Sequence, residues 1–531
     1  MQNIWYHMEV GVRLVGILLR FLNFILTPLF WLKSHKRTCV PPVTEPMLFK
    51  GAADLAREIR NGEITSTQVV TMYIKRIKEV NPYLNAVVED RYRAALYEAR
   101  ACDVQIKEAM RLGTIEDLVK NKPLLGVPFT VKESCSLGGL SNSVGCLENA
   151  GRKATADGAA VALVRDAGAI PLLVSNTPEL CLGWETTNLL TGTTNNPYWL
   201  SKTPGGSSGG EAALLASAAS PFSVSSDIAG SIRVPAAFCG VYGHKPTPGI
   251  IPIEGHIPTL SDEQFPKFLT VGPMARKAED LPLLLNVMAG ENRHVLNLDE
   301  PVNIEDIEVF YMTEAMDSIA LIKVDKCIQD AVLEAVQYLS RCGATVSEEK
   351  FKGLEDSVEI SISVFFSMKD IPNMLQDPAD PKREKNLFLE ILKCPIGGAS
   401  RSLQGLSFAL IEKTRLFIPK SKTDFYKDKA DKLRTEITRR LGARGVLLYP
   451  AHGGAAHAHG GVFPRASGVL YTMPFNILGL PAAVAPLALR RDLRRALPVC
   501  LQIIAAPNQD RLCLAVAKQL EMGFGGWRPP Q

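Results

Sequence analysis

The sequence predicts an α/β protein in which helices cover a large sheet, preceded by a separate apolar helix near the N-terminus. Three observations predict this fold class. Apolar residues recur at helical spacing from about residue 50 to 112, a helix-like segment at 157–167 leads into a strand-like segment at 169–174, and strand-like runs return near the C-terminus. Because the strand-like segments lie far apart along the chain, we expect one large domain rather than several small ones.

The first element is an apolar segment at residues 14–32, which is the candidate membrane or targeting element. Its length suits a single transmembrane span. However, Arg20 lies in its middle, and Arg13, Arg20 and Asn23 share one face, as in a helix that lies in the membrane interface. No small-residue cleavage site follows it. We therefore expect residues 1–34 to form a retained anchor that spans the membrane once, with an interfacial helix as the alternative.

A proline-containing linker at residues 35–48 follows the anchor, and residues 49–531 are expected to form a single domain. The domain begins with helices and continues into alternating helices and strands. Segment 381–445 is expected to be largely helical, strand-like runs follow at 446–449 and 499–505, and a helix lies near 509–522.

The overall composition is that of an ordinary globular protein. The 531 residues are 46% hydrophobic and 21% charged, with a net charge of +4. Basic residues do not interleave with aromatic ones, which argues against a nucleic-acid partner. The 11 cysteines include no CxxC pair, so we expect free thiols rather than a disulfide framework or a metal site.

The apolar run 124–132 indicates a buried strand that ends in a charged residue, Lys132. One interpretation is that Lys132 extends to solvent from the strand end. The other is that it enters a buried site, where desolvation brings a lysine toward its neutral form. A neutral amine is a usable general base.

The segment Pro204-Gly-Gly-Ser-Ser-Gly-Gly-Glu211 is unusually rich in glycine and serine. A flexible linker is disfavoured because strong helix formers follow at once. A phosphate loop would need a Gly-Lys-Ser/Thr ending, which is missing. The remaining interpretation is a tight loop at a helix N-terminus, where glycines let backbone N–H groups approach a reacting atom.

A second tight turn, Asp227-Ile-Ala-Gly-Ser231, follows a short strand at 222–226. Ser207 and Ser231 are 24 positions apart, so a helix and a strand could bring the two serine loops together. None of the eight histidines lies in a catalytic motif. Those at 452–459 are better explained by a Gly/Ala-rich loop than by a metal site. Lys132 is therefore the better candidate base.

These segments together resemble the amidase signature family. The resemblance rests on GVPFTVKE around Lys132, PGGSSGG around Ser207 and DIAGSIRVPA around Ser231, and it covers about residues 45 to 527. It implies a large, mixed, twisted β-sheet covered by α-helices on both faces. It also implies a Ser-Ser-Lys triad that cleaves amide C–N bonds without a cofactor.

The resemblance implies a role for each residue of the site. Lys132 would be the base, Ser207 would relay the proton, and Ser231 would be the nucleophile that forms an acyl-enzyme. Cys181 falls where a family member has a residue that contacts substrate. The expected oxyanion-hole donors are the backbone N–H groups of Ile228, Ala229, Gly230 and Ser231. The residues expected to brace the loops are Ser208, Asp227 and Arg233.

Within the family, the likeness is strongest to fatty-acid amide hydrolases that have one N-terminal membrane segment. Shared features lie at residues 43–46, 76–82, 448–450 and 524–527. The implied substrates are primary fatty amides such as oleamide and N-acylethanolamines. The implied location is an intracellular membrane, the endoplasmic reticulum or a lipid droplet, with a homodimer left open.

Ala229 departs from the Gly-Gly-Ser that is usual in the family, so we expect this position to have an ordinary backbone conformation. Two other functions stay open. One is a glutamine or small-amide amidase, including an amidotransferase subunit. The other is a membrane-anchored binding protein that has lost turnover, which the presence of Lys132, Ser207 and Ser231 argues against.

Overall fold

The computed structural model describes residues 9–34, 37–315, 318–377, 380–492 and 495–531. Residues 1–8 of the predicted anchor and 35–36 of the predicted linker lie outside the described residues. The strands are β1 (Val87–Asp90), β2 (Pro128–Lys132), β3 (Ile170–Ser175), β4 (Thr187–Asn188), β5 (Gly192–Thr193), β6 (Phe222–Asp227), β7 (Tyr242–Lys245), β8 (Thr270–Ala275), β9 (Glu308–Tyr311), β10 (Thr345–Glu348), β11 (Gln376–Asp377), β12 (Asp380–Glu384), β13 (Gly445–Pro450), β14 (Ala482–Asp492) and β15 (Arg495–Ala505).

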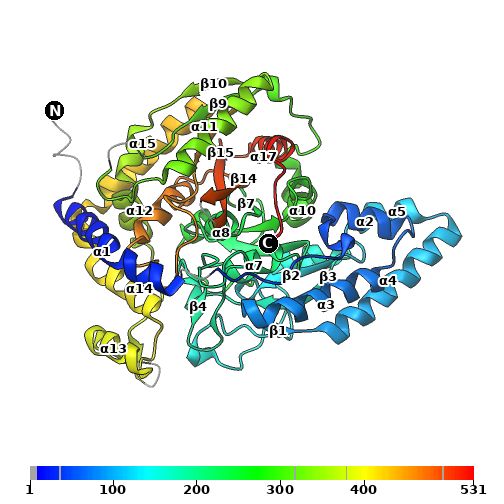
Figure 1. Ribbon diagram of the computed structural model, residues 1–531, viewed down its shortest axis with the longest axis horizontal. Coiled ribbons are helices and arrows are strands. Elements are labelled where there is room, and N and C mark those ends of the chain that lie inside the picture. Colours follow the sequence, from blue (N-terminus) through cyan, green and yellow to red (C-terminus); the bar gives the residue numbers. More distant parts are fainter. Residues whose placement is uncertain (1–8, 35–36, 316–317, 378–379, 493–494) are drawn as a thin grey trace.

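Helices flank the large sheet. They are α1 (Val10–Ser34), α2 (Ala52–Arg60), α3 (Ser66–Leu84), α4 (Tyr92–Leu112), α5 (Ile115–Asn121), α6 (Ala159–Asp166), α7 (Gly209–Ala216), α8 (Arg233–Cys239), α9 (Phe265–Phe268), α10 (Asp280–Ala289), α11 (Lys326–Arg341), α12 (Ser357–Phe365), α13 (Leu387–Lys393), α14 (Leu403–Thr414), α15 (Thr423–Leu441), α16 (Pro474–Ile477) and α17 (Asp510–Phe524). Figure 1 shows α2–α5 at one end of the molecule and α1, α13 and α14 at the other.

The central element is an 11-stranded sheet in the order β1-β3-β2-β6-β8-β7-β14-β15-β13-β9-β10. It is mixed, because β2 is parallel to both β3 and β6, whereas β8 is antiparallel to β6 and β7. Its strands are drawn from residues 87 to 505, which confirms the predicted α/β class with a large mixed sheet flanked by helices. The division into one domain at 49–531 stays a prediction.

The parallel pairing of β2 with β6 positions the two loops of interest. Thr130 pairs with Ser223 and Val131 with Val224, so both strands run in the same direction. The carboxyl ends of adjacent parallel strands lie at the same edge of a sheet. Lys132, the last residue of β2, therefore lies at the edge where the chain leaves β6 toward Ser231.

Helix α7 follows the Gly-Ser loop, as predicted, and every one of its residues is buried. Glycine is required at its first turn, because a Cβ on Gly210 would lie 2.6 Å from the carbonyl oxygen of Asn176. Segment 381–445 is largely helical, as expected, with α13, α14 and α15 separated by short turns, although its first residues belong to β12.

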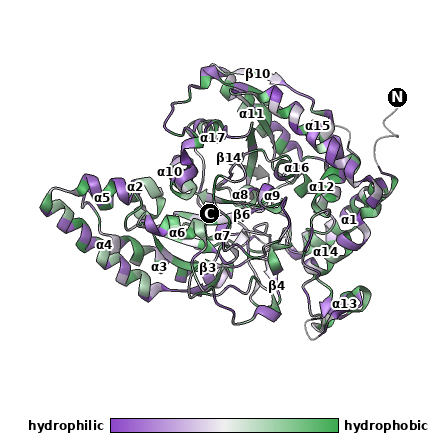
Figure 2. Ribbon diagram, turned by 180° about the vertical axis from the view of Figure 1, so that it is seen from behind, coloured by the Kyte–Doolittle hydropathy of each residue, from purple (hydrophilic) through white to green (hydrophobic). Residues whose placement is uncertain are grey.

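Helix α1 is the one helix of the described residues that is long and apolar enough to cross a membrane. Figures 1 and 2 show it lying along the outside of the molecule beside α14, with hydrophobic residues along both helices. Its buried residues, Val12, Arg13, Gly16 and Ser34, share the face that packs against the rest of the chain. The opposite face, which includes Leu14 at 62% and Phe21 at 58% exposure, is uncovered.

Candidate active site

Lys132 lies completely buried at the end of β2, in contact with two serines. Its Nζ is 2.7 Å from Ser207 Oγ and 3.0 Å from Ser226 Oγ. Lys132 does not extend to solvent, so the interpretation as a buried lysine is confirmed. Its amine nitrogen is within hydrogen-bond distance of a hydroxyl on the Gly-Ser loop.

Ser226 connects Lys132 to a histidine. His256 Nδ1 lies 3.1 Å from the carbonyl oxygen of Pro258, and a carbonyl can only accept, so Nδ1 carries the proton. His256 Nε2, 2.9 Å from Ser226 Oγ, is then the acceptor. Burial lowers the pKa of His256 to about 3 and keeps the ring neutral. Ser226 therefore donates to His256 and accepts from Lys132.

The Gly-Ser loop is held directly against the turn that carries Ser231. The peptide between Gly206 and Ser207 is cis, and the Ser207 carbonyl accepts a 3.1 Å hydrogen bond from Thr177 Oγ1. The Ser208 N–H donates to the Ser231 carbonyl oxygen at 3.1 Å. The expected contact between the two serine loops is therefore present.

The carboxylate of Asp227 shapes the Ser231 turn. It accepts from the Gly230 N–H at 2.7 Å and from the Ile232 N–H at 3.0 Å. Gly230 has a φ of 100°, whereas Ala229 is not among the residues with positive φ. The alanine therefore occupies an ordinary backbone conformation, as its side chain requires.

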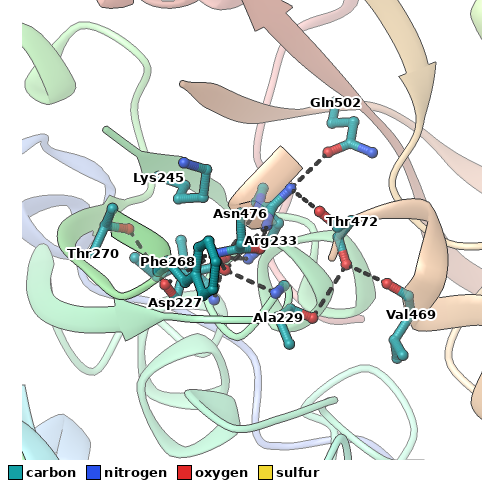
Figure 3. Close-up of polar contacts among 12 residues, drawn as sticks. Asp227, Ala229, Arg233, Lys245, Phe268, Thr270, Val469, Thr472, Asn476 and Gln502 are labelled. Atoms are coloured by element: carbon teal, nitrogen blue, oxygen red, sulfur yellow. Dashed lines mark hydrogen bonds and ion pairs between the residues drawn. The ribbon is translucent and has the colours of Figure 1, made fainter. Parts of the chain in front are cut away.

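Figure 3 shows how Asp227 is tied to the C-terminal part of the chain. Arg233 Nη2 and Nε each lie 3.1 Å from a carboxylate oxygen of Asp227. Arg233 also donates to the Thr472 carbonyl at 2.8 Å and to Gln502 Oε1 at 3.2 Å. Asn476 Nδ2 donates to Asp227 Oδ1 at 2.9 Å. These buried contacts join strand β6 to segments more than 200 residues away.

The charge of Asp227 is stabilised inside the protein. Burial alone would raise the pKa of this carboxyl, but the Arg233 charge and the hydrogen bonds from Arg233 and Asn476 hold it well below its usual range. Asp227 is therefore ionised, and its oxygens are acceptors for the backbone of the turn. Because the Gly230 N–H donates to Asp227, it is engaged outside the predicted oxyanion hole, which leaves Ile228, Ala229 and Ser231 as candidate donors.

A cavity opens beside Ser231 and continues between helices from distant parts of the sequence. Ser231 is only 4% exposed, and Cys181, Ile228 and Ala229 line the same cavity. Most of the remaining wall is apolar. It includes residues of α1, α12 and α14, namely Val12, Val15, Leu19, Val358, Ile362, Phe365, Phe408 and Ile411.

Comparison with known proteins places this geometry in a family. A family model described as Amidase matches residues 68–514. The chain belongs to the amidase family. It is 39% identical to Fatty-acid amide hydrolase 2-A of Danio rerio over 98% of this chain and 97% of that protein. It is 38% identical to Fatty-acid amide hydrolase 2 of Homo sapiens over 92% of each. A solved structure of fatty acid amide hydrolase shares the fold, with a TM-score of 0.69 and 21% identity over 91% of this chain and 87% of that one.

As an amidase, the protein is an enzyme that hydrolyses amide C–N bonds. The site fits this reaction chemically, because a buried amine contacts a serine hydroxyl and a second serine lies on a turn rich in backbone N–H groups. An activated hydroxyl and nearby N–H donors are the two requirements of acyl transfer.

Several residues of the amidase site could not be found from the sequence. Ser226 and His256 complete the hydrogen-bond chain of Lys132, and Thr472, Asn476 and Gln502 hold the Asp227–Arg233 pair. The sequence gives a weak indication of Ser226, because this residue directly precedes the Ser231 turn. It gives no indication of His256 or of the three residues from the C-terminal part of the chain.

Two further histidines and a possible metal cluster among the described residues lie outside this site. His452 and His457 are buried and pack edge-on against Phe238. Among the described residues, Cys146, Glu148 and Glu179 are close enough to hold a metal ion. However, Arg401 Nη1 lies within 3.3 Å of all three side chains and forms ion pairs with both carboxylates. This arrangement is an ion-pair cluster built around an arginine.

Proposed function

We propose that the protein hydrolyses fatty-acid amides, both primary amides and N-acylethanolamines, through an acyl-enzyme on Ser231. The observation that carries this proposal is the apolar cavity that begins at Ser231 and runs along α12 and α14 to α1. Such a wall suits an alkyl chain, whose burial stabilises binding by about 0.8 kcal/mol per CH₂. The names of the relatives in zebrafish and human support the same substrate class.

The first half of the reaction transfers the acyl group to Ser231. Its Oγ attacks the amide carbonyl carbon while its proton moves to Ser207 Oγ, and the Ser207 proton moves to neutral Lys132 Nζ. The carbonyl oxygen becomes an oxyanion, stabilised by the N–H groups of Ile228, Ala229 and Ser231. The C–N bond then breaks, and the amine leaves with the proton returned from Lys132 through Ser207.

The second half releases the acid. A water molecule loses a proton along the same path and attacks the acyl carbon, and the C–O bond to Ser231 breaks as its Oγ regains a proton. Ser208, Asp227 and Arg233 brace the two loops throughout, and Cys181 lies against the substrate. No cofactor takes part in these steps.

We also propose that α1 and the neighbouring apolar surface attach the protein to an intracellular membrane, such as the endoplasmic reticulum or the lipid droplet. Figure 2 shows α1 beside α14 at the outside of the molecule. Phe388 and Leu392 of α13, more than 70% exposed, extend the apolar surface. The docked position of α1 favours the interfacial orientation over a span. A homodimer stays a prediction.

The test compares free-acid release from oleamide, an N-acylethanolamine and glutamine by the full-length enzyme in membranes. We expect turnover of the two lipid amides. Turnover of glutamine alone would instead support a small-amide amidase. A fluorophosphonate probe should label the parent but not Ser231→Ala, and undiminished labelling of that variant would refute Ser231 as the nucleophile.

A further inference from the structure

Helix α1 forms part of the wall of the active-site cavity. Val12, Val15, Gly16 and Leu19 line the same cavity as Ser231. The spacing of 12, 16 and 19 places these residues on one face of the helix. Val12 is 1% exposed and Gly16 is buried, whereas Leu18, on the outer face, is 53% exposed. The inner face of α1 therefore lines the cavity, and its outer face is exposed.

Polar contacts hold this face against the catalytic part of the chain. Arg20 Nη2 donates to the carbonyl oxygens of Ser318 and Leu321, at 3.0 Å and 2.7 Å. Arg465 Nε donates to Asn23 Oδ1 at 3.1 Å. Arg20 and Asn23, which are unusual residues in an apolar helix, thus have hydrogen-bond partners elsewhere in the protein.

Close packing supports the same position of α1. A Cβ on Gly16 would lie 2.8 Å from the Ile319 carbonyl oxygen and 2.9 Å from Ala320 Cα. At the start of the helix, the Glu9 carboxylate accepts from Lys422 Nζ at 2.5 Å and from Tyr426 OH at 2.9 Å. These contacts along its length show that α1 packs against the rest of the protein in one rotational orientation about its axis.

We propose that α1 is a specificity-determining wall of the acyl-binding site, with Val15 and Leu19 contacting the alkyl chain of the substrate. The inference rests on the proposed function, since it assumes that the cavity takes an acyl chain. It assigns α1 a second role that a membrane anchor alone does not require. Changing a side chain on the inner face should alter the choice of acyl chain, while the same change on the outer face should not.

The experiment uses the full-length enzyme in detergent, where membrane attachment does not limit access. Leu19→Trp narrows the cavity, and Leu18→Trp is the matched control at an adjacent leucine on the outer face. Two fluorophosphonates, one with an ethyl and one with a hexadecyl chain, label Ser231, and the ratio of their labelling rates is measured. This readout reports chain binding without requiring amide turnover.

We expect Leu19→Trp to lower the hexadecyl-to-ethyl ratio by about tenfold or more, because overfilling an apolar site is unfavourable. Leu18→Trp should keep the parental ratio. Leu19→Ala, which removes chain contacts without overfilling, should lower the ratio by about threefold. Ethyl labelling in each variant shows that the site has folded.

A parental ratio in both Leu19→Trp and Leu19→Ala would overturn the inference. An equal loss in Leu18→Trp and Leu19→Trp would overturn it as well, because the effect would not depend on the inner face. If neither probe labels Ser231 in the parent, the proposed nucleophile and function are refuted, and the inference falls with them.

Discussion

At the scale of single residues, Lys132 Nζ lies between two serine hydroxyls, and this placement makes the protonation of the lysine decisive. Ser207 can pass on a proton only when the amine is neutral. Lys132→Ala should therefore lower kcat/KM at neutral pH by about 10²–10⁴-fold, the usual contribution of a general base. Part of the activity should return at high pH, where hydroxide replaces the base.

Rates measured from pH 7 to pH 10 on the parent and Lys132→Ala test this role. Lys132→Arg is the matched control, because arginine keeps a long basic side chain of similar volume but stays protonated. It should be inactive across the whole range. A pH profile of Lys132→Ala that matches the parent profile would contradict the assignment.

Gly230 and Ala229 offer a paired test of the Ser231 turn. A Cβ on Gly230 would overlap Thr472 Oγ1 and lie 2.8 Å from Thr472 Cβ, at a φ of 100°. Gly230→Ala should thus cost about 1–3 kcal/mol of stability and abolish labelling of Ser231. Ala229→Gly needs no new space and should cost about 1 kcal/mol at most. Thermal unfolding and probe labelling measure both, and an active, stable Gly230→Ala would refute this account.

The residues of the proposed catalytic site were accessible from the sequence to different degrees. Lys132, Ser207 and Ser231 lie in local motifs, so their proximity could be predicted from segments of a few residues. His256 could not, because its role depends on a loop that folds back on Ser226. Gly230 was expected to donate to an oxyanion, and its bond to Asp227 depends on side-chain geometry that no spacing encodes.

At the scale of elements, α1 shows that an amphipathic sequence pattern predicts a polar helix face but not what that face contacts. Arg13, Arg20 and Asn23 indicated a helix at a membrane surface. In the structure, Arg20 and Asn23 form hydrogen bonds with other parts of the protein. The partners lie about 300 and 440 residues away, beyond the reach of any local pattern.

Arg20 should control how firmly α1 is held. Arg20→Met keeps a long side chain but removes the hydrogen bonds to Ser318 and Leu321, which are worth about 1–3 kcal/mol when the donor is charged. We expect faster amide hydrogen exchange across residues 10–34 in detergent. Leu14→Met, at an exposed position of the same helix, is the control. Unchanged exchange in Arg20→Met would show that these bonds do not hold the helix.

At the scale of the whole molecule, stability should depend on the charge of Glu359, a buried residue of α12. Burial raises the pKa of its carboxyl from 4.5 to about 7. The folded state thus binds the proton more tightly than the unfolded state. The protein loses stability as the pH rises from about 4.5 through 7, by up to about 3 kcal/mol.

Glu359→Gln removes the titrating group while keeping its shape. The variant should be more stable than the parent at pH 8 and close to it at pH 5, as measured by thermal unfolding at both values. A constant difference between the two proteins at pH 5 and pH 8 would show that Glu359 does not titrate in this range.

The whole-molecule architecture could be predicted only as a class. Alternating helix and strand patterns indicated an α/β fold, and β2, β3, β6, β13 and α17 fall where strands and a helix were expected. The strand order was not accessible, because it depends on pairings such as β7 with β14 across more than 200 residues. The resemblance to the amidase family supplied the large mixed sheet that local patterns could not.

The network around Asp227 has a consequence for synthesis on the ribosome. Thr472, Asn476 and Gln502, which contact Arg233 beside the turn that presents Ser231, emerge late. Helix α1 emerges long before them, so the proposed anchor can meet a membrane before the proposed nucleophile is in position. On this proposal, the enzyme gains its reactivity only late in translation, after its location has been decided.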